Sequence, residues 1–346
     1  MTKNIVVFSD GTGQEGGEGN NTNVYKLFNM LENRTDRQIT FYDRGLGTGW
    51  RKISGNVGGM GISKNILECY EFIFDHFCAG DRIYLFGFSR GATTVRSLSG
   101  FMHHFGILPK SRPELIDKAY TIYKIRPKKE NKEGLKKWQG KVDDFIEANS
   151  TMYTKIEFIG VWDTVAALGL PFQPLDAILN EIPGFAHKFH DLRLSQGVKH
   201  ARHALAIDDQ RLTFHPTLWD KDIEIDQSMK QVWFCGMHTD VGGGYKKHNL
   251  SDITLEWMMR EATDKGLLIY RDFPEKRDPD PNGHMHDSRG SFFTKLFRKK
   301  SRCWNSATHG KPVIHESVTQ RTKNEKNNEN PKYDPWILKM DYDIEQ

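Results

Sequence analysis

The sequence predicts an α/β fold of three layers, in which a mainly parallel central sheet lies between helices and carries helical insertions. Short apolar runs rich in β-favouring residues alternate along the chain with segments whose apolar residues recur at helical spacing. The runs are apolar throughout, as in strands that are covered on both faces. With 346 residues, 37% of them hydrophobic, the chain can bury a large core.

The first half of the chain shows the alternation most clearly. We predict a strand at 5–8, a helix at 22–31, a strand at 39–42, a helix at 62–77 and a strand at 83–86. Strands that alternate with helices are joined by right-handed crossovers, which make the sheet parallel.

The second half continues the pattern less regularly. The predicted elements are a helix at 92–102, a charged helical insertion at about 109–150, a strand at 156–162, a helix at 198–207, a strand at 230–236 and a helix from 251 onward. Residues 1–270 form one predicted domain. Residues 271–346 are a polar, basic extension, which we expect either to pack on that domain or to be partly mobile.

The composition narrows the class of protein. A formal net charge of +4 is too small to argue for nucleic-acid binding. The four cysteines form no C-x-x-C motif, so we expect them to be reduced and buried. No run has the length of a membrane span, and the apolar run at 5–8 is too short for a signal peptide. We expect cytoplasmic synthesis, with export without a cleaved signal peptide left open.

A nucleophile is predicted at Ser89. The run 83–86 is followed by Gly87-Phe-Ser-Arg-Gly91, which fits G-x-S-x-G between a strand and a helix. In such an elbow the serine hydroxyl stands clear of the backbone, and the next N–H, here that of Arg90, faces the developing oxyanion. The alternative is a tight turn that uses the two glycines for packing alone.

The loop after the first strand has three interpretations. Residues 9–16 contain G-x-G-x-x-G, but no helix opens inside the motif, so we do not expect a nicotinamide site or any other cofactor. The loop also resembles the D-x-D-G-T of aspartyl phosphatases, but Phe8 occupies the nucleophile's position. The third interpretation is that the N–H groups of Gly11 or Thr12 complete an oxyanion hole beside Ser89.

Two further strand ends supply the partners of a triad. Asp163 ends the strand at 156–162, and His238 lies on a Gly-rich loop after the strand at 230–236. Ser89, Asp163 and His238 follow the chain order of α/β-hydrolases, and a histidine held by a carboxylate is what a serine nucleophile requires. We therefore expect an α/β-hydrolase-like fold.

Competing residues remain open. His315 is the runner-up base, and Asp240 is the runner-up acid although it is too near His238 in the chain to reach the same ring easily. A metal site built from Asp10, Asp163, His238 and Asp240 has no tight ligand spacing to support it, so we predict none.

Several short motifs together resemble the domain family that includes the type VI secretion lipase effectors of the Tle1 type. They lie at 8–12, 21–24, 45–48, 87–92, 161–164, 203–211 and 232–245. The resemblance implies an α/β-hydrolase core, a triad that carries over to Ser89, Asp163 and His238, and phospholipase A activity on glycerophospholipids. It also implies a secretion-apparatus or immunity partner. The chain departs from the larger effectors in having little beyond the catalytic domain.

Lipid substrates would need apolar walls. The segment 168–185 is apolar and interrupted by prolines, which suits either an acyl-chain wall or a loop that caps the core. The substrate-binding residues we predict are Asp10, Phe88, Leu170, Phe172 and Leu175. The basic, apolar run at 292–301 predicts peripheral contact with a membrane. The alternatives are a soluble carboxylesterase and a non-catalytic interaction domain that kept the fold.

Overall fold

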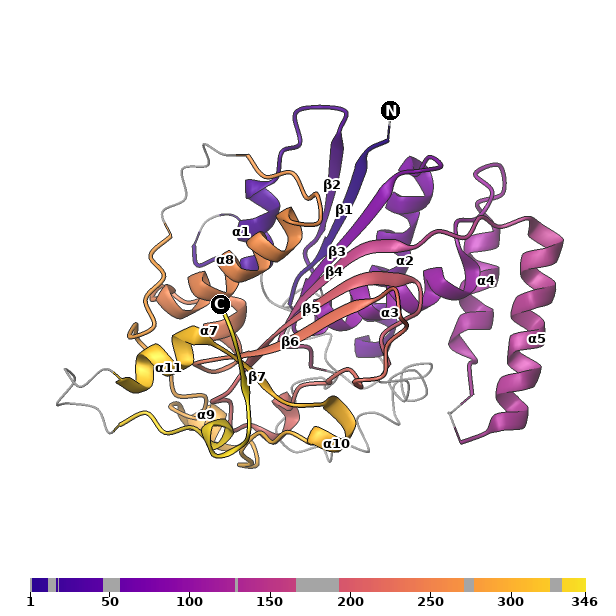
Figure 1. The fold of residues 1–346 in the computed structure, drawn as a ribbon. Helices are drawn as coiled ribbons and strands as arrows, with labels where there is room; N and C mark the ends of the chain where they lie inside the picture. Colours follow the sequence, from indigo (N-terminus) through magenta and orange to yellow (C-terminus); the bar gives the residue numbers. More distant parts are fainter. Residues whose placement is uncertain are drawn as a thin grey trace.

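The protein is an α/β structure built on a single eight-stranded sheet (Figure 1). The computed structural model describes residues 2–11, 17, 19–45, 57–127, 130–165, 193–270, 277–323 and 332–346. The strands are β1 (Asn4–Ser9), β2 (Gln38–Asp43), β3 (Arg82–Phe88), β4 (Ile156–Trp162), β5 (Val198–Ala206), β6 (Ser228–Phe234), β7 (Val313–His315) and β8 (Asp343–Glu345). Their order across the sheet is β2-β1-β3-β4-β5-β6-β7-β8, and each neighbouring pair is parallel.

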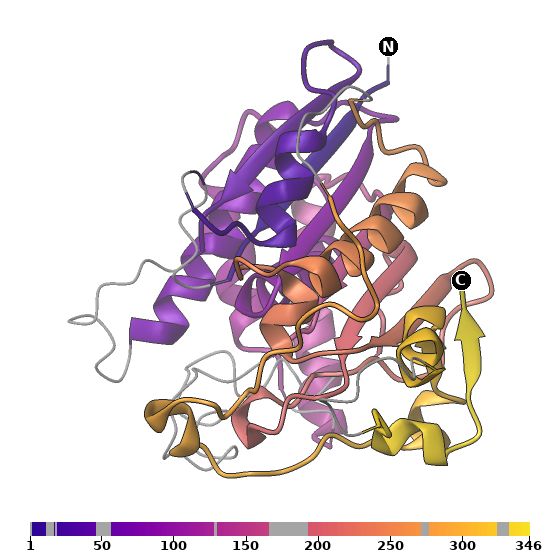
Figure 2. The same ribbon diagram turned by 90° about the vertical axis from the view of Figure 1, so that its left-hand side faces the viewer.

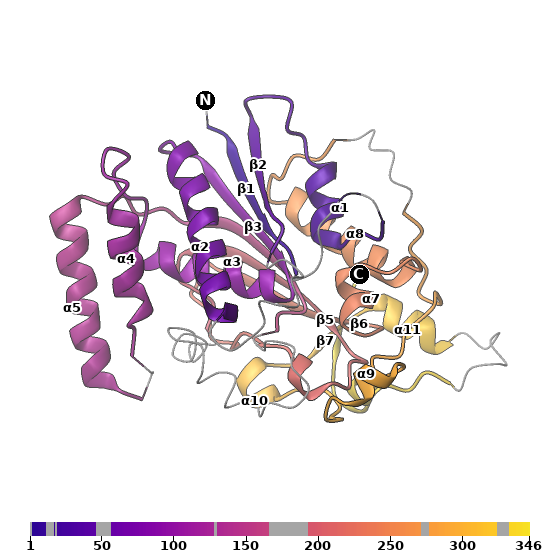
Figure 3. The same ribbon diagram turned by 180° about the vertical axis from the view of Figure 1, so that it is seen from behind.

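Helices cover both faces of the sheet, which confirms the predicted α/β fold. The main helices are α1 (Asn23–Met30), α2 (Val57–His76), α3 (Arg90–Phe105), α4 (Leu115–Lys124), α5 (Lys132–Asn149) and α8 (Asn249–Thr263). The shorter ones are α7 (His238–Gly242), α9 (Phe292–Lys295), α10 (Ser306–His309) and α11 (Glu316–Lys323), with 3-10 turns η2 (Leu212–Phe214) and η3 (Trp336–Lys339). Figure 3 shows α2 and α3 on one face, while α1 and α8 lie on the other.

Two hydrophobic clusters hold the layers together. Val7 of β1 joins the cluster that packs against α2 and α3, whereas its neighbour Val6 joins the cluster that packs against α1 and α8. Successive side chains of a strand point to opposite faces, so an apolar run such as 5–8 supplies both clusters at once. This is why the strands read as continuous rather than alternating apolar segments.

One predicted element is wrong. We expected a helix at 198–207, but these residues form β5, between β4 and β6 in the sheet. Alanines at 201, 204 and 206 favour helix in an isolated segment. Here they are fully buried, and strand pairing on both sides outweighs the local preference.

The C-terminal part of the chain enters the same sheet. β7 pairs with β6, and β8 pairs with β7 at the sheet edge (Figure 2). The helices of the predicted insertion, α4 and α5, stand together at the outer side of α3 in Figure 1. In the part of the chain that the structure describes, no helix is long and apolar enough to cross a membrane.

Candidate active site

Ser89 occupies a strained turn between β3 and α3. Its backbone has φ 57° and ψ −118°, although serine carries a Cβ that disfavours positive φ. Such a conformation costs on the order of 1–3 kcal/mol and persists only where the surrounding structure imposes it. The Ser89 N–H donates to the carbonyl of Trp162 at 3.1 Å, which ties the turn to β4.

The two glycines of the elbow are required by close packing. A Cβ at Gly91 would lie 1.9 Å from the carbonyl oxygen of Ser9, and a Cβ at Gly87 would lie 2.6 Å from the N of Ala92. Both distances are far below van der Waals contact. The two glycines therefore allow the strands and helix α3 to approach one another closely around Ser89.

Asp163 and His238 form a buried pair at the carboxyl ends of the strands. Asp163 follows β4 directly, and His238 is the first residue of α7, which follows β6. The His238 Nδ1–H donates to Asp163 Oδ2 at 2.6 Å. Because β3 and β4 are parallel neighbours, Ser89 and Asp163 leave the sheet side by side. Asp163, like Ser89, has a positive φ, which is 40°.

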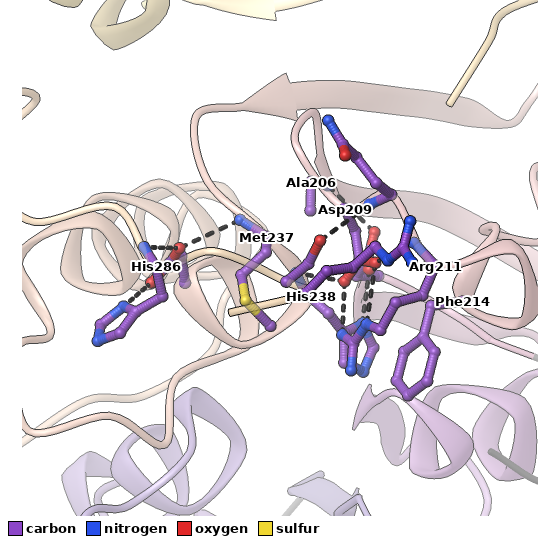
Figure 4. A network of polar contacts seen from close by, with 12 residues as sticks. Ala206, Asp209, Arg211, Phe214, Met237, His238 and His286 are labelled. Carbon is purple, nitrogen blue, oxygen red and sulfur yellow. Dashed lines mark hydrogen bonds and ion pairs between the residues drawn. The ribbon is translucent and has the colours of Figure 1, made fainter. Parts of the chain in front are cut away.

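Both oxygens of the Asp163 carboxylate accept hydrogen bonds from other residues besides His238. Arg302 donates Nη1–H to Oδ1 at 2.6 Å and Nη2–H to Oδ2 at 2.8 Å, and the N–H of Ala206 donates to Oδ1 at 3.0 Å. The Arg302 and Asp163 side chains are completely buried. Figure 4 shows this network together with Asp209 and Arg211.

Charge and burial set the resting ionisation states. Burial would raise the pKa of Asp163, but the Arg302 charge and the hydrogen bonds from Arg302 and His238 hold it well below its usual range. Burial lowers the pKa of His238, against the opposing effect of Asp163, so its imidazole is neutral near pH 7. With Nδ1 protonated toward Asp163, the Nε2 lone pair is the basic one.

The His238 ring is packed between two phenylalanines. The ring of Phe88, the residue before Ser89, lies 4.6 Å from it, and the ring of Phe214 in η2 lies 5.2 Å away. Gly242 is required here too, because a Cβ would lie 2.0 Å from the Phe88 ring. Phe88, predicted to bind substrate, is thus a buried wall behind the imidazole.

The predicted oxyanion donors differ in their availability. Arg90 is the first residue of α3, where a backbone N–H has no partner within the helix. Gly11 lies beside Ser89, since its Cβ position is 3.5 Å from the Ser89 Cβ. However, the Gly11 N–H already donates to Asp10 Oδ1 at 2.7 Å. Thr12 lies outside the described residues.

Asp10 braces the loop after β1. Its carboxylate accepts hydrogen bonds from Thr22 Oγ1 at 2.5 Å and Tyr42 Oη at 2.7 Å, besides that from Gly11. Burial raises the pKa of Asp10 to about 6, and these hydrogen bonds oppose the rise. We predicted a substrate contact here; the structure shows a carboxylate engaged within the protein. The other predicted substrate contacts, Leu170, Phe172 and Leu175, lie outside the described residues.

The competing residues have partners of their own. His315 lies in β7, where its Nδ1 is 2.9 Å from Ser317 Oγ and burial lowers its pKa to about 4. Asp240 accepts from His286 Nδ1 at 2.6 Å, and in Figure 4 Met237 lies between His286 and His238. Across the described ranges, no group of three or more His, Cys, Asp or Glu could hold a metal ion.

Arg302, Phe214 and His286 are the residues of this region that sequence reasoning missed. Arg302 is 139 positions from Asp163, in a stretch whose composition is simply basic, so no local pattern marks it. His286 lies two positions after His284, and no local pattern marks it as the partner of Asp240. No local pattern around Phe214 indicates its contact with His238.

Comparison with known proteins gives a family match over most of the chain. Residues 3–261 match the family described as "T6SS, Phospholipase effector Tle1-like, catalytic domain". A curated relative, the uncharacterized protein YEL023C of Saccharomyces cerevisiae, is 27% identical over 314 residues. The alignment covers 85% of this chain and 44% of the yeast protein, so the chain spans less than half of that relative's length.

Three solved structures show lower similarity. An uncharacterized protein from Pseudomonas aeruginosa has TM-score 0.44 and 17% identity, with 78% of this chain and 47% of that one covered. The Tle1 effector bound to the VgrG spike of the type 6 secretion system has TM-score 0.37 and 19% identity, covering 71% and 52%. An esterase from Thermogutta terrifontis has TM-score 0.39 and 12% identity, covering 79% and 85%.

Proposed function

The chain belongs to the family of T6SS phospholipase effector Tle1-like catalytic domains, and on that premise we propose that it is a serine ester hydrolase, a phospholipase A acting on glycerophospholipids. Family membership supports a hydrolase of the lipase and esterase type. The single observation that carries the finer proposal is the strained Ser89 elbow together with the 2.6 Å His238–Asp163 pair, both at the carboxyl ends of the strands.

The proposed reaction uses the residues in the usual order of acyl transfer. Ser89 Oγ attacks the ester carbonyl while His238 Nε2 takes its proton, and the Arg90 N–H stabilises the oxyanion. The imidazolium then protonates the departing alcohol, which leaves an acyl-enzyme. Water, deprotonated by His238, attacks the acyl group and releases the fatty acid together with Ser89. Asp163 keeps the His238 tautomer correct throughout.

An exposed apolar patch next to the site supports a lipid substrate. Phe292 and Phe293 of α9 expose 77% and 73% of their surface, although aromatic side chains normally bury most of it. The same run carries the exposed basic residues 298–300. Its Phe297 packs on Phe214 at 5.7 Å, and Phe214 in turn packs on His238. A membrane held by this patch would therefore lie close to the imidazole.

A panel of substrates tests the proposal. Wild type and Ser89→Ala are assayed on phospholipid vesicles of several headgroups and on a short soluble ester, with positional release of fatty acid recorded. Phospholipid turnover that disappears in Ser89→Ala supports the phospholipase. Turnover of the soluble ester alone would indicate a carboxylesterase. No turnover, with no labelling of Ser89 by a fluorophosphonate, would indicate a non-catalytic domain.

The biological setting stays a prediction. The family implies a secretion-apparatus or immunity partner and export without a cleaved signal peptide. The Tle1 effector was solved bound to the VgrG spike, so binding of this chain to a spike protein is the partner we propose to test by co-purification.

A further inference from the structure

The Arg302 side chain is bonded at four points. Besides its two bonds to the Asp163 carboxylate, Nη1–H donates to the carbonyl of Ala206 at 2.5 Å and Nη2–H to that of Phe214 at 2.8 Å. A planar guanidinium held by two backbone carbonyls cannot rotate, so its fork presents the two N–H groups to Asp163 in one plane.

This contact determines how the carboxylate faces the imidazole. A carboxylate can turn about its Cβ–Cγ bond, and Oδ2 must face Nδ1 for the pair with His238 to form. Arg302 and the Ala206 N–H together occupy Oδ1, while Oδ2 takes the second Arg302 bond and His238. Without Arg302, a completely buried carboxylate would also lose its only ion-pair partner besides His238 among the described residues.

We propose that Arg302 is a positioning residue of the active site, so the chain beyond the family-matched region 3–261 completes that site. Backbone bonds link the same segment to the loop after β5. The Lys300 N–H donates to the carbonyl of Gln210, and the Leu212 N–H donates to that of Arg298, both at 2.9 Å. The inference rests on the proposed function for the reaction it serves, but the contact itself can be tested without substrate.

The test compares Arg302→Met, Arg302→Lys and the control Arg37→Met, an exposed arginine that precedes β2. On an ester that the wild type hydrolyses, Arg302→Met should lower kcat by about 10²- to 10⁴-fold with little change in KM. The upper figure is the cost of a misoriented triad, about 10⁴-fold. Arg302→Lys should recover part of this, because lysine keeps the charge but not the fork. The acid limb of the pH profile should move to higher pH in Arg302→Met.

A readout without substrate separates this proposal from the proposed function. The His238 Nδ1 proton should give a downfield NMR resonance, assigned by its loss in His238→Ala, and Arg302→Met should weaken or shift it. That change in a protein with no esterase activity would sustain the positioning role while the function fails. A folded Arg302→Met with wild-type resonance, kcat and pH profile overturns it. If Arg302→Met does not fold, the same readouts on Arg302→Lys decide.

A separate feature is a cavity of about 350 Å³. Its walls are residues 96–104 of α3, the end of α4 and the segments that precede β5 and β6, and they include neither Ser89 nor His238. The volume falls within the usual range for small-ligand sites. Arg96, Arg126 and Arg193 line it, with Asp222 and Glu224 among the remaining walls.

Arg96 gives the cavity its chemical character. Its guanidinium donates to the carbonyl of Thr217 at 2.5 Å and lies over the Trp219 ring at 4.5 Å. Burial lowers the pKa of Arg96 to about 9, and no carboxylate of the described chain pairs with it. Glu224, one of the two acidic residues of the lining, accepts from Gln196 at 2.6 Å. A partly buried cation with no carboxylate partner among the described residues is stabilised by an incoming anion.

We infer that this cavity binds a phosphate group, carried either by a small soluble ligand or by a lipid headgroup. Guanidinium groups suit phosphate because their paired N–H donors match its oxygens. The arms of the test separate the two sources: sn-glycerol 3-phosphate is titrated by calorimetry, and vesicles of phosphatidylcholine with or without phosphatidic acid are used in flotation. Ser89→Ala is the background for the vesicle arm, so that lipid is not consumed.

Arg96→Met should weaken the binding that is observed by about 10- to 100-fold, as expected for the loss of a charge-assisted hydrogen bond. The control Arg37→Met, an exposed arginine outside the cavity, should leave it unchanged. Binding of the soluble phosphate alone identifies a free ligand, and binding of phosphatidic acid vesicles alone identifies a headgroup. Binding in neither arm, or binding that survives Arg96→Met, overturns the inference. Arg96→Gln replaces Arg96→Met if the latter does not fold.

Discussion

The His238 Nδ1 lies 2.6 Å from the Asp163 Oδ2, although 75 positions separate the two residues and β5 lies between the strands that carry them. The loop after β6 must therefore pass across the end of β5 to reach Asp163. The segment after β5 helps to hold the loop there, because Asp209 of that segment accepts the His238 N–H at 3.3 Å.

Ser89→Ala should lower kcat by about 10⁴- to 10⁶-fold while the fold is kept, because members of a triad act as a unit. Ser150→Ala is a matched control: Ser150 also has a positive φ, 49°, but ends α5 on the exposed surface. Steady-state kinetics and circular dichroism of both variants check this. Activity retained in Ser89→Ala would exclude an acyl-enzyme on this residue.

His238→Ala should be about as damaging to kcat as Ser89→Ala, while His286→Ala and His315→Ala should be mild. The physical reason is that only His238 is paired with Asp163, whereas His286 is paired with Asp240 and His315 with Ser317. The three variants are compared at one pH on one substrate. If His286→Ala were the most damaging, the base would belong to the second histidine–carboxylate pair.

Gly91→Ala should destabilise the protein severely, by about 3 kcal/mol or more, because the new methyl group would meet the backbone of Ser9 at 1.9 Å. Gly140→Ala should do the opposite and stabilise by about 0.5–1 kcal/mol, because Gly140 lies within α5 with nothing within 4 Å of its Cβ position. Urea denaturation of the two variants checks both signs. Equal effects would mean that helix α3 does not approach β1 as closely as described.

The stability of the protein should fall between about pH 4 and pH 6 through Asp10. Burial raises the pKa of Asp10 to about 6, above an unfolded value near 3.8, so the folded state holds this proton more tightly. Its contribution is fully present below the unfolded pKa and is lost as the pH rises through 6, by on the order of 3 kcal/mol. Urea denaturation of wild type and Asp10→Asn across this range should show the difference between them changing by that amount. Parallel curves would contradict it.

Activity on lipid should depend on the exposed phenylalanines of α9. Replacing Phe292 and Phe293 with serine should reduce turnover of long-chain phospholipid in anionic vesicles by about tenfold or more, since apolar area is lost from the membrane contact. Hydrolysis of a short soluble ester should be unchanged. Salt should weaken the preference for anionic vesicles, because it screens the exposed basic residues of this run.

The matched control is Ile225→Ser, which removes a fully exposed apolar side chain in the segment that leads into β6. That variant should behave as wild type on both substrates. Equal losses on vesicles and on the soluble ester in the Phe292 and Phe293 variant would instead indicate damage to the site through Phe297.

Sequence patterns alone predict the α/β class, the elbow at Ser89 and the ends of the strands that carry Asp163 and His238. These features are local: a buried strand is apolar over a few consecutive residues, and G-x-S-x-G needs its glycines at fixed positions. The structure confirmed the α/β fold and brought Asp163 and His238 into contact, while the catalytic roles of the three residues stay predictions. The segment at 198–207 shows the limit, because alanine burial between two strands is decided by the neighbours and not by the segment.

The surroundings of these residues come from contacts between distant parts of the chain. Arg302 reaches Asp163 from 139 positions away, Phe214 packs on His238, and Asp10 takes the N–H of Gly11 that sequence reasoning assigned to an oxyanion. A buried carboxylate must find partners for its charge, but a sequence does not say which of many arginines supplies it. Those choices depend on how the sheet and its loops close around one another, and they leave no period or motif along the chain.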